Sequence, residues 1–62
     1  MFIKINSSIK GIVYLNINSI EQFFFEKNQT KIFLVGSDEE YIPTQQTPEQ
    51  IMKLIEEARK CL

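Results

Sequence analysis

The sequence contains no histidine and no tryptophan, and it has one cysteine, two glycines and two prolines. Without histidine, the side chain most often used as a general base is missing. The two glycines, Gly11 and Gly36, stand far apart, so the chain has neither the G-x-G-x-x-G nor the Walker pattern for phosphate binding. No nucleophile elbow and no motif with paired carboxylates is present. We therefore expect no enzyme activity, no catalytic residues, no cofactor and no small-molecule substrate.

The single cysteine, Cys61, excludes an intrachain disulfide. One cysteine without histidine also cannot build a zinc site, so no metal site is expected. We interpret Cys61 as a small apolar side chain in the last helical turn, not as a nucleophile. A lone thiol fits a reducing compartment, the first residues do not resemble a signal peptide, and no apolar run approaches the ~20 residues that span a bilayer. We expect a cytoplasmic protein with no membrane association.

The charge of the chain is nearly balanced, with seven basic and eight acidic residues and a net charge of −1. Nucleic-acid affinity depends on clustered positive charge, and here the basic residues are scattered along the chain. The acidic segment at 38–40 lacks the ligand spacing of a calcium loop and is interpreted as a solvated turn. Composition therefore favours a protein partner over nucleic acid.

The length of 62 residues fits a single domain covering residues 1–62. A domain this small buries only about 60% of its unfolded surface. Such domains usually depend on a disulfide, a metal or an oligomer for additional stability. Because the first two are excluded, we expect association with a second copy or with another protein.

Five segments have the composition and alternation of strands: residues about 1–6, 12–15, 20–27, 30–35 and 40–42. The short connections between them imply antiparallel neighbours. Pro43 closes the last segment, which places that segment at an edge of the sheet or Pro43 at the strand end. The predicted fold class is α+β, a small antiparallel β-meander of about four strands followed by one C-terminal helix packed on one face.

The helix is predicted at about residues 48–60. Thr47 and Gln50 have the spacing of a capping box, and Pro48 is suited to the first helical position. The apolar residues that follow recur at helical spacing and predict one buried stripe. Its members are Ile51, Leu54, Ile55, Ala58 and Leu62.

Both faces of the predicted sheet are apolar, although one helix can cover only one of them. In the segment 20–27, Phe24 shares a face with Ile20, and Phe23 and Phe25 lie on the opposite face. We expect a partner to cover the face that the helix leaves open, through the interface candidates Phe2, Phe23, Phe25, Phe33 and Val35. The alternative is that the sheet curls and buries both faces in itself, as a small barrel does.

These patterns predict a non-catalytic interaction or regulatory module that self-associates, as a dimer, through the face away from the helix. One alternative is a small nucleic-acid-binding regulator that uses Lys27, Lys31 and Tyr14. The other is a phage- or plasmid-encoded inhibitor of a host protein, with the acidic segment 38–40 facing a basic target.

Residues 14–21, YLNINSIE, resemble a pattern of the FlbD family of small bacterial proteins linked to flagellar genes. The similarity continues through residues 30–34, Gly36, the pair 41–42 and the helix start at 47–51, and covers roughly residues 12–55. The resemblance implies a similar fold and a regulatory association, and it implies no catalytic residues. The same strand-turn-strand rhythm also looks like part of the LytTR type of DNA-binding domain.

Overall fold

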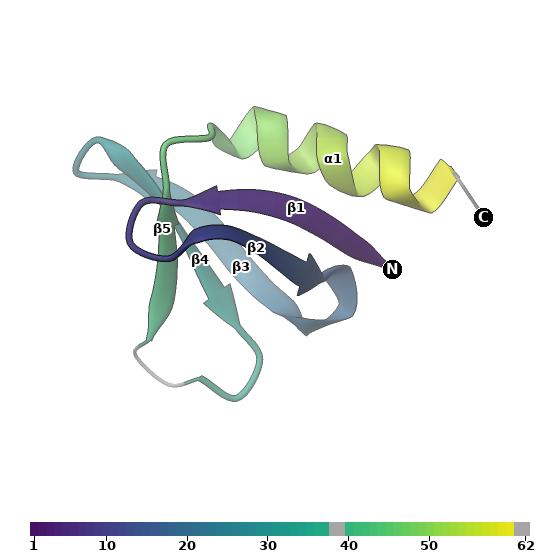
Figure 1. Ribbon diagram of the computed structural model, residues 1–62, viewed down its shortest axis with the longest axis horizontal. Helices are drawn as coiled ribbons and strands as arrows, with labels where there is room; N and C mark the ends of the chain where they lie inside the picture. Colours follow the sequence, from purple (N-terminus) through teal and green to yellow (C-terminus); the bar gives the residue numbers. More distant parts are fainter. Residues whose placement is uncertain (38–39, 61–62) are drawn as a thin grey trace.

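The computed structural model describes residues 1–37 and 40–60 of the chain (Figure 1). It contains five strands and one α-helix, so the α+β fold is confirmed. All five predicted strand segments are present, which is one more than the approximate count of four given for the meander. In chain order the elements are β1 (Phe2–Ser7), β2 (Gly11–Asn16), the 3₁₀ turn η1 (Ile17–Ser19), β3 (Ile20–Glu26), β4 (Gln29–Leu34), β5 (Tyr41–Thr44) and α1 (Pro48–Lys60).

The five strands form one antiparallel sheet in the order β2-β1-β5-β4-β3. The consecutive hairpins β1–β2, β3–β4 and β4–β5 make it meander-like, as predicted. β2 and β3 are its two edges, so the sheet is open and does not close into the barrel considered above. In Figure 1, the β1–β2 hairpin lies in front of β3 and β4, and α1 runs alongside β1.

β5 lies between β1 and β4, so the expectation of an edge position drawn from Pro43 is wrong. The strand also continues past Pro43 to Thr44. Proline fits here because β1 pairs with β5 at a single position, Ser7 with Thr44. The ladder between the two strands thus ends before it would need an amide hydrogen from Pro43, whose carbonyl still accepts from the N–H of Ser8 at 2.9 Å.

Some turn residues adopt the left-handed backbone conformation, with a positive φ. Gly11 has a φ of 76°, which glycine adopts without steric cost. Lys27 and Asn28 connect β3 and β4 with φ values of 54° and 65°, the sign required at both positions of a two-residue type I′ turn. The Asn16 side chain caps η1 by accepting from the N–H of Asn18 at 2.9 Å.

One hydrophobic core lies between the sheet and the helix. The β1–β2 and β4–β5 hairpins both contribute to it, since the alternating residues of β1 and β2 meet those of β4 and β5. Phe23 and Leu34 pack against its margin, half-buried. The buried members come from four strands, η1 and the helix, and are Ile3, Ile5, Leu15, Ile17, Ile32, Ile42, Ile51 and Ile55.

The helix begins and ends where the sequence predicts, at Pro48 and Lys60. Its capping box is formed: the N–H of Gln50 donates to Oγ1 of Thr47 at 3.1 Å, and the N–H of Thr47 donates to Oε1 of Gln50 at 2.8 Å. Ile51 and Ile55 of the predicted stripe are buried, whereas Cys61 and Leu62 lie outside the described residues. Within the described part of the chain, no helix has the length and apolar character needed to cross a bilayer.

Candidate functional site

The sheet has an inner side, which faces the core, and an outer side, which faces away from it. Side chains alternate between the two sides along each strand. Ile42 and Ile32 pair across β4 and β5 and are both buried, so their neighbours Tyr41 and Phe33, which also pair, lie on the outer side. The outer side carries most of the exposed aromatic residues of the protein, namely Phe2, Tyr14, Phe24 and Tyr41, and is the candidate site.

Three aromatic rings on the outer side of β3, β4 and β5 form a cluster, which we call the aromatic cluster. The rings of Phe24 and Phe33 are stacked, with centroids 5.5 Å apart and planes at 21°. The Tyr41 ring lies 5.5 Å from that of Phe33 at 47°. Phe24 and Tyr41 keep 39% and 37% of their surface exposed. The three rings therefore pack against one another and together form an apolar surface.

A charged pair borders this cluster. Lys31 Nζ donates to Glu26 Oε1 at 2.8 Å and lies 4.9 Å from the centre of the Tyr41 ring. The hydrogen bond from Lys31, and next its charge, hold the pKa of the Glu26 carboxyl below its ordinary value. The same hydrogen bond raises the pKa of Lys31. Both charges are thus engaged within the protein, and the ion pair fixes the polar rim of the aromatic cluster.

This pair predicts a pH dependence. Its stabilisation through Glu26 is present above the ordinary carboxyl pKa of 4.5 and is lost as the pH falls through the lowered folded value. Its stabilisation through Lys31 is present below 10.5 and is lost as the pH rises through the raised folded value. The difference in unfolding free energy between wild type and Glu26→Gln should therefore be flat between these two values and shrink on both sides.

Urea unfolding at a series of pH values measures this difference. The matched control is Glu26→Gln in a Lys31→Met background. Because the partner charge is absent there, the effect of Glu26→Gln on the unfolding free energy should not show this dependence on pH. If the difference in unfolding free energy between wild type and Glu26→Gln stays constant down to strongly acidic pH, the ion pair contributes nothing to stability.

A second apolar area lies on the outer side of β1 and β2, and we call it the β1–β2 patch. It consists of Phe2, Ile12 and Tyr14, which are 63%, 56% and 64% exposed. These residues alternate with buried or half-buried members of the same two strands. Lys4 pairs with Tyr14 and is the one charged side chain between them. The patch is the most exposed group of large apolar side chains in β1 and β2.

The structure divides the five predicted interface residues. Phe2 and Phe33 lie on the outer side, as predicted, and Val35 is exposed just after the end of β4. Phe23 and Phe25 pair with Ile32 and Thr30, so they lie on the inner side, contrary to the predicted face. Phe23 packs against the core and Phe25 remains 56% exposed near the β3–β4 turn. A role for any of the five in an interface stays a prediction.

A β-bulge explains the reversal. The pairing of β3 with β4 shifts between Ile20 and Gln22, so Ile20 and Phe23 both face the core although they are three residues apart. Strict alternation from Ile20 moves Phe23 to the outer side and Phe24 to the inner side. Phe24 was missed as an outer residue for this reason. Tyr41 and Ile12 were also missed, although the alternation of Tyr41 with Ile42 and of Ile12 with Val13 is a signal that could have identified them.

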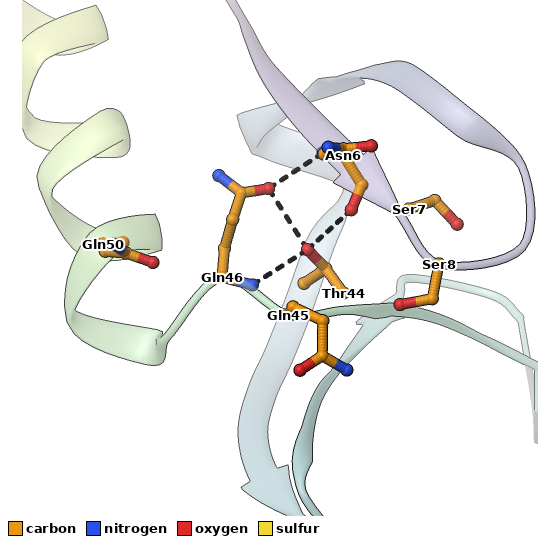
Figure 2. Close-up of a pocket in the computed structure, with 7 residues that line it drawn as sticks. All are labelled: Asn6, Ser7, Ser8, Thr44, Gln45, Gln46 and Gln50. Atoms are coloured by element: carbon orange, nitrogen blue, oxygen red, sulfur yellow. Dashed lines mark hydrogen bonds between the residues drawn. The ribbon is translucent and has the colours of Figure 1, made fainter.

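A polar hollow lies elsewhere, where β1, β5 and the start of α1 meet (Figure 2). It has a volume of about 300 Å³ and is lined by Asn6, Ser7, Ser8, Thr44, Gln45, Gln46 and Gln50. Figure 2 shows that the hydrogen bonds at its wall join its own residues to one another. Among the described residues, no group of three histidine, cysteine or carboxylate side chains is arranged to hold a metal ion.

These hydrogen bonds give the hollow a structural role. The Asn6 N–H donates to Oε1 of Gln46 at 2.8 Å, and the Asn6 carbonyl accepts from Oγ1 of Thr44 at 2.8 Å. The same Thr44 hydroxyl accepts from the N–H of Gln46 at 3.2 Å. The side chains of Gln46 and Thr44 thus bond the backbone of Asn6 in the place where a neighbouring strand would otherwise pair with it. We call this network the polar joint, because it connects β1 to the segment that leads into the helix.

Comparison of the chain with protein-family models, with curated proteins and with solved structures finds no match. The resemblance to the FlbD family therefore stays a prediction from the sequence motif. The acidic segment proposed to face a basic target includes residues 38 and 39, which lie outside the described residues.

Proposed function

We propose that the chain is a small non-catalytic interaction module, acting in the cytoplasm, that associates with a second copy of itself through the outer side of its sheet. The observation that carries this proposal is the placement of exposed aromatic and aliphatic residues on that side, while the one helix covers the inner side. A regulatory role, which the FlbD resemblance implies, belongs to the same proposal.

Energetics favour association. Burying one large apolar side chain stabilises by about 1.5–3 kcal/mol, and a core of this size supplies about 3–5 kcal/mol in total. Covering even two of the exposed residues Phe2, Ile12 and Tyr14 is therefore comparable with the stability of the isolated domain. A second copy also makes stability depend on concentration, because association stabilises the folded form.

Nucleic-acid binding has less support. Lys31, one of the basic residues considered for that role, is already bonded to Glu26, whose carboxylate places negative charge beside the aromatic cluster. Tyr14 belongs to the β1–β2 patch, on a different hairpin from Lys27 and Lys31. A titration with single-stranded DNA at two salt concentrations separates the alternatives: phosphate contacts must weaken as salt rises, and our proposal predicts no binding at either salt.

Light scattering on two double variants tests which part of the outer side associates. Phe2→Ser with Ile12→Ser removes most of the β1–β2 patch, and Phe24→Ser with Tyr41→Ser removes most of the aromatic cluster. At least one double variant should shift the dissociation constant upward by about tenfold or more, a loss of about 1.4 kcal/mol, while its circular dichroism stays that of the folded domain. If both variants associate as the wild type does, the outer side is not the interface.

A further inference from the structure

The free edge of β2 carries backbone groups that no other described strand uses. β2 is the last strand of the sheet and pairs with β1 only. The Ile17 N–H donates to the Met1 carbonyl at 3.0 Å, which marks a hydrogen-bonded position of this ladder. Such positions alternate along an antiparallel pair. Steps of two back from Ile17 reach Leu15, Val13 and Gly11, whose backbone groups therefore point toward β1. Ile12 and Tyr14 lie between these positions, so their N–H and C=O groups point away from β1.

The hydrogen bonds on the side of β1 away from β2 support this assignment of inward and outward positions. The same alternation requires the backbone groups of Asn6 to point away from β2, and both are bonded there, to the Gln46 and Thr44 side chains. The direction of the Ile12 and Tyr14 groups thus follows from two independent sets of hydrogen bonds. Each of these two residues presents one donor and one acceptor at the open edge of the sheet.

The two edges of the sheet differ in how they resist pairing with another strand. Natural edge strands are usually protected by charges, prolines or bulges. β3 has a bulge near Glu21 and carries a second carboxylate at Glu26. β2, with the sequence GIVYLN, has no charge and no proline, and its register with β1 runs without a shift. Only the β2 edge is therefore suited to accept a strand.

We propose that β2 pairs antiparallel with β2 of a second copy about a two-fold axis at Val13, which joins the two sheets into one. This inference rests on the self-association proposed above and narrows its contact to the β2 edge, where Ile12 and Tyr14 are the residues of the outer side that meet the second copy. In this register Ile12 of each copy lies opposite Tyr14 of the other, and these are the residues whose backbone groups point outward. Four hydrogen bonds form, and every outward group of these residues is used.

The side chains suit the same register. Ile12 and Tyr14 face each other on the outer side, and an aromatic residue opposite a β-branched one is a favourable cross-strand pair. Val13 lies opposite its own copy on the inner side, beside the core against which it already packs. Because β2 carries no charged residue, no like charges are brought together within the pair. The donors, acceptors and side chains of β2 are thus complementary to β2 itself, which identifies the second copy as the occupant.

Amide hydrogen exchange on the unmodified protein tests the pairing. The amides of Ile12 and Tyr14 should exchange freely at about 5 μM and become protected by about fivefold or more at several hundred micromolar. The Val13 amide, which points toward β1, should be protected at both concentrations and serves as the internal control. If light scattering shows association while the Ile12 and Tyr14 amides stay unprotected, the edge pairing is overturned and the proposed function stands. If the protein remains monomeric, both are overturned.

Tyr14→Pro provides a second test that does not depend on exchange. Proline removes the outward amide, which β1 does not use, and an edge strand tolerates it at such a position. Tyr14→Val is the matched control, because it changes the side chain and keeps the amide. We expect the dissociation constant to rise about tenfold or more for the proline variant and about threefold or less for valine. Equal effects of the two substitutions in folded protein would contradict pairing through the backbone.

Discussion

Replacing Ile51 with alanine is expected to remove most of the free energy that stabilises the fold. Ile51 lies near the start of α1, is fully buried and belongs to the core to which the β1–β2 and β4–β5 hairpins contribute. Truncating a buried isoleucine to alanine costs about 2–5 kcal/mol, because the transfer free energy is lost and a cavity remains. A domain of this size has about 3–5 kcal/mol to lose, so the single change removes much or all of its stability.

Urea unfolding followed by circular dichroism measures this loss, at a protein concentration low enough that association does not contribute. The matched control is Met52→Ala in the next position of the same helix, where the side chain is 45% exposed. That variant should stay within about 0.5 kcal/mol of the wild type. An Ile51→Ala protein as stable as the Met52→Ala protein would mean that the helix does not close the core as described.

Replacing Thr44 with valine is expected to cost about 1–3 kcal/mol, the penalty for leaving buried polar groups without partners. Its hydroxyl is fully buried, donates to the Asn6 carbonyl and accepts from the Gln46 N–H. Valine has nearly the same shape, so the change removes these hydrogen bonds and little of the packing. The polar joint would then lose the contact that connects β1 to the segment before the helix.

Thr30 offers an unusually close control, because it lies directly opposite Thr44 in the β4–β5 ladder and is equally buried. In the described part of the chain its Oγ1 has no hydrogen-bond partner. Thr30→Val therefore removes a buried polar atom without breaking a bond, and we expect it to be neutral or to stabilise. Thermal unfolding of both variants gives the comparison, and equal losses at the two positions would contradict the hydrogen bonding assigned to Thr44.

The helix was predictable to the residue because its signals are local. The capping box of Thr47 and Gln50 and the proline at the first position involve neighbours in sequence, and the structure forms the same contacts. Most strands were also predictable, since alternation and short turns act over a few residues. The strand segments therefore appear close to their predicted bounds, with β5 extending two residues further.

The features that were missed depend on residues far apart in the chain. The bulge in β3 becomes visible only when β4 is paired beside it, and it reversed the expected sides of Phe23 and Phe24. The central position of β5 depends on one bridge between Ser7 and Thr44. Alternation within one strand gives relative sides of its residues, but it does not tell which side the helix will cover.

The polar joint was missed for the same reason. Asn6 and Gln46 are 40 residues apart, and a glutamine in the short QQ pair has no sequence pattern that identifies its partner. The outer apolar side was predictable in outline, because two-sided strands with a single helix leave one face uncovered. Its membership changed: Phe24, Tyr41, Ile12 and Tyr14 join Phe2 and Phe33 there.

Sedimentation equilibrium of the unmodified protein, from about 5 μM to about 300 μM, tests the central claim of self-association most directly. We predict a weight-average mass that rises from near the chain mass of 7.3 kDa toward twice that value. A rise that reaches a plateau at two chains fits a closed two-fold dimer. A mass that stays at 7.3 kDa across the whole range would contradict self-association.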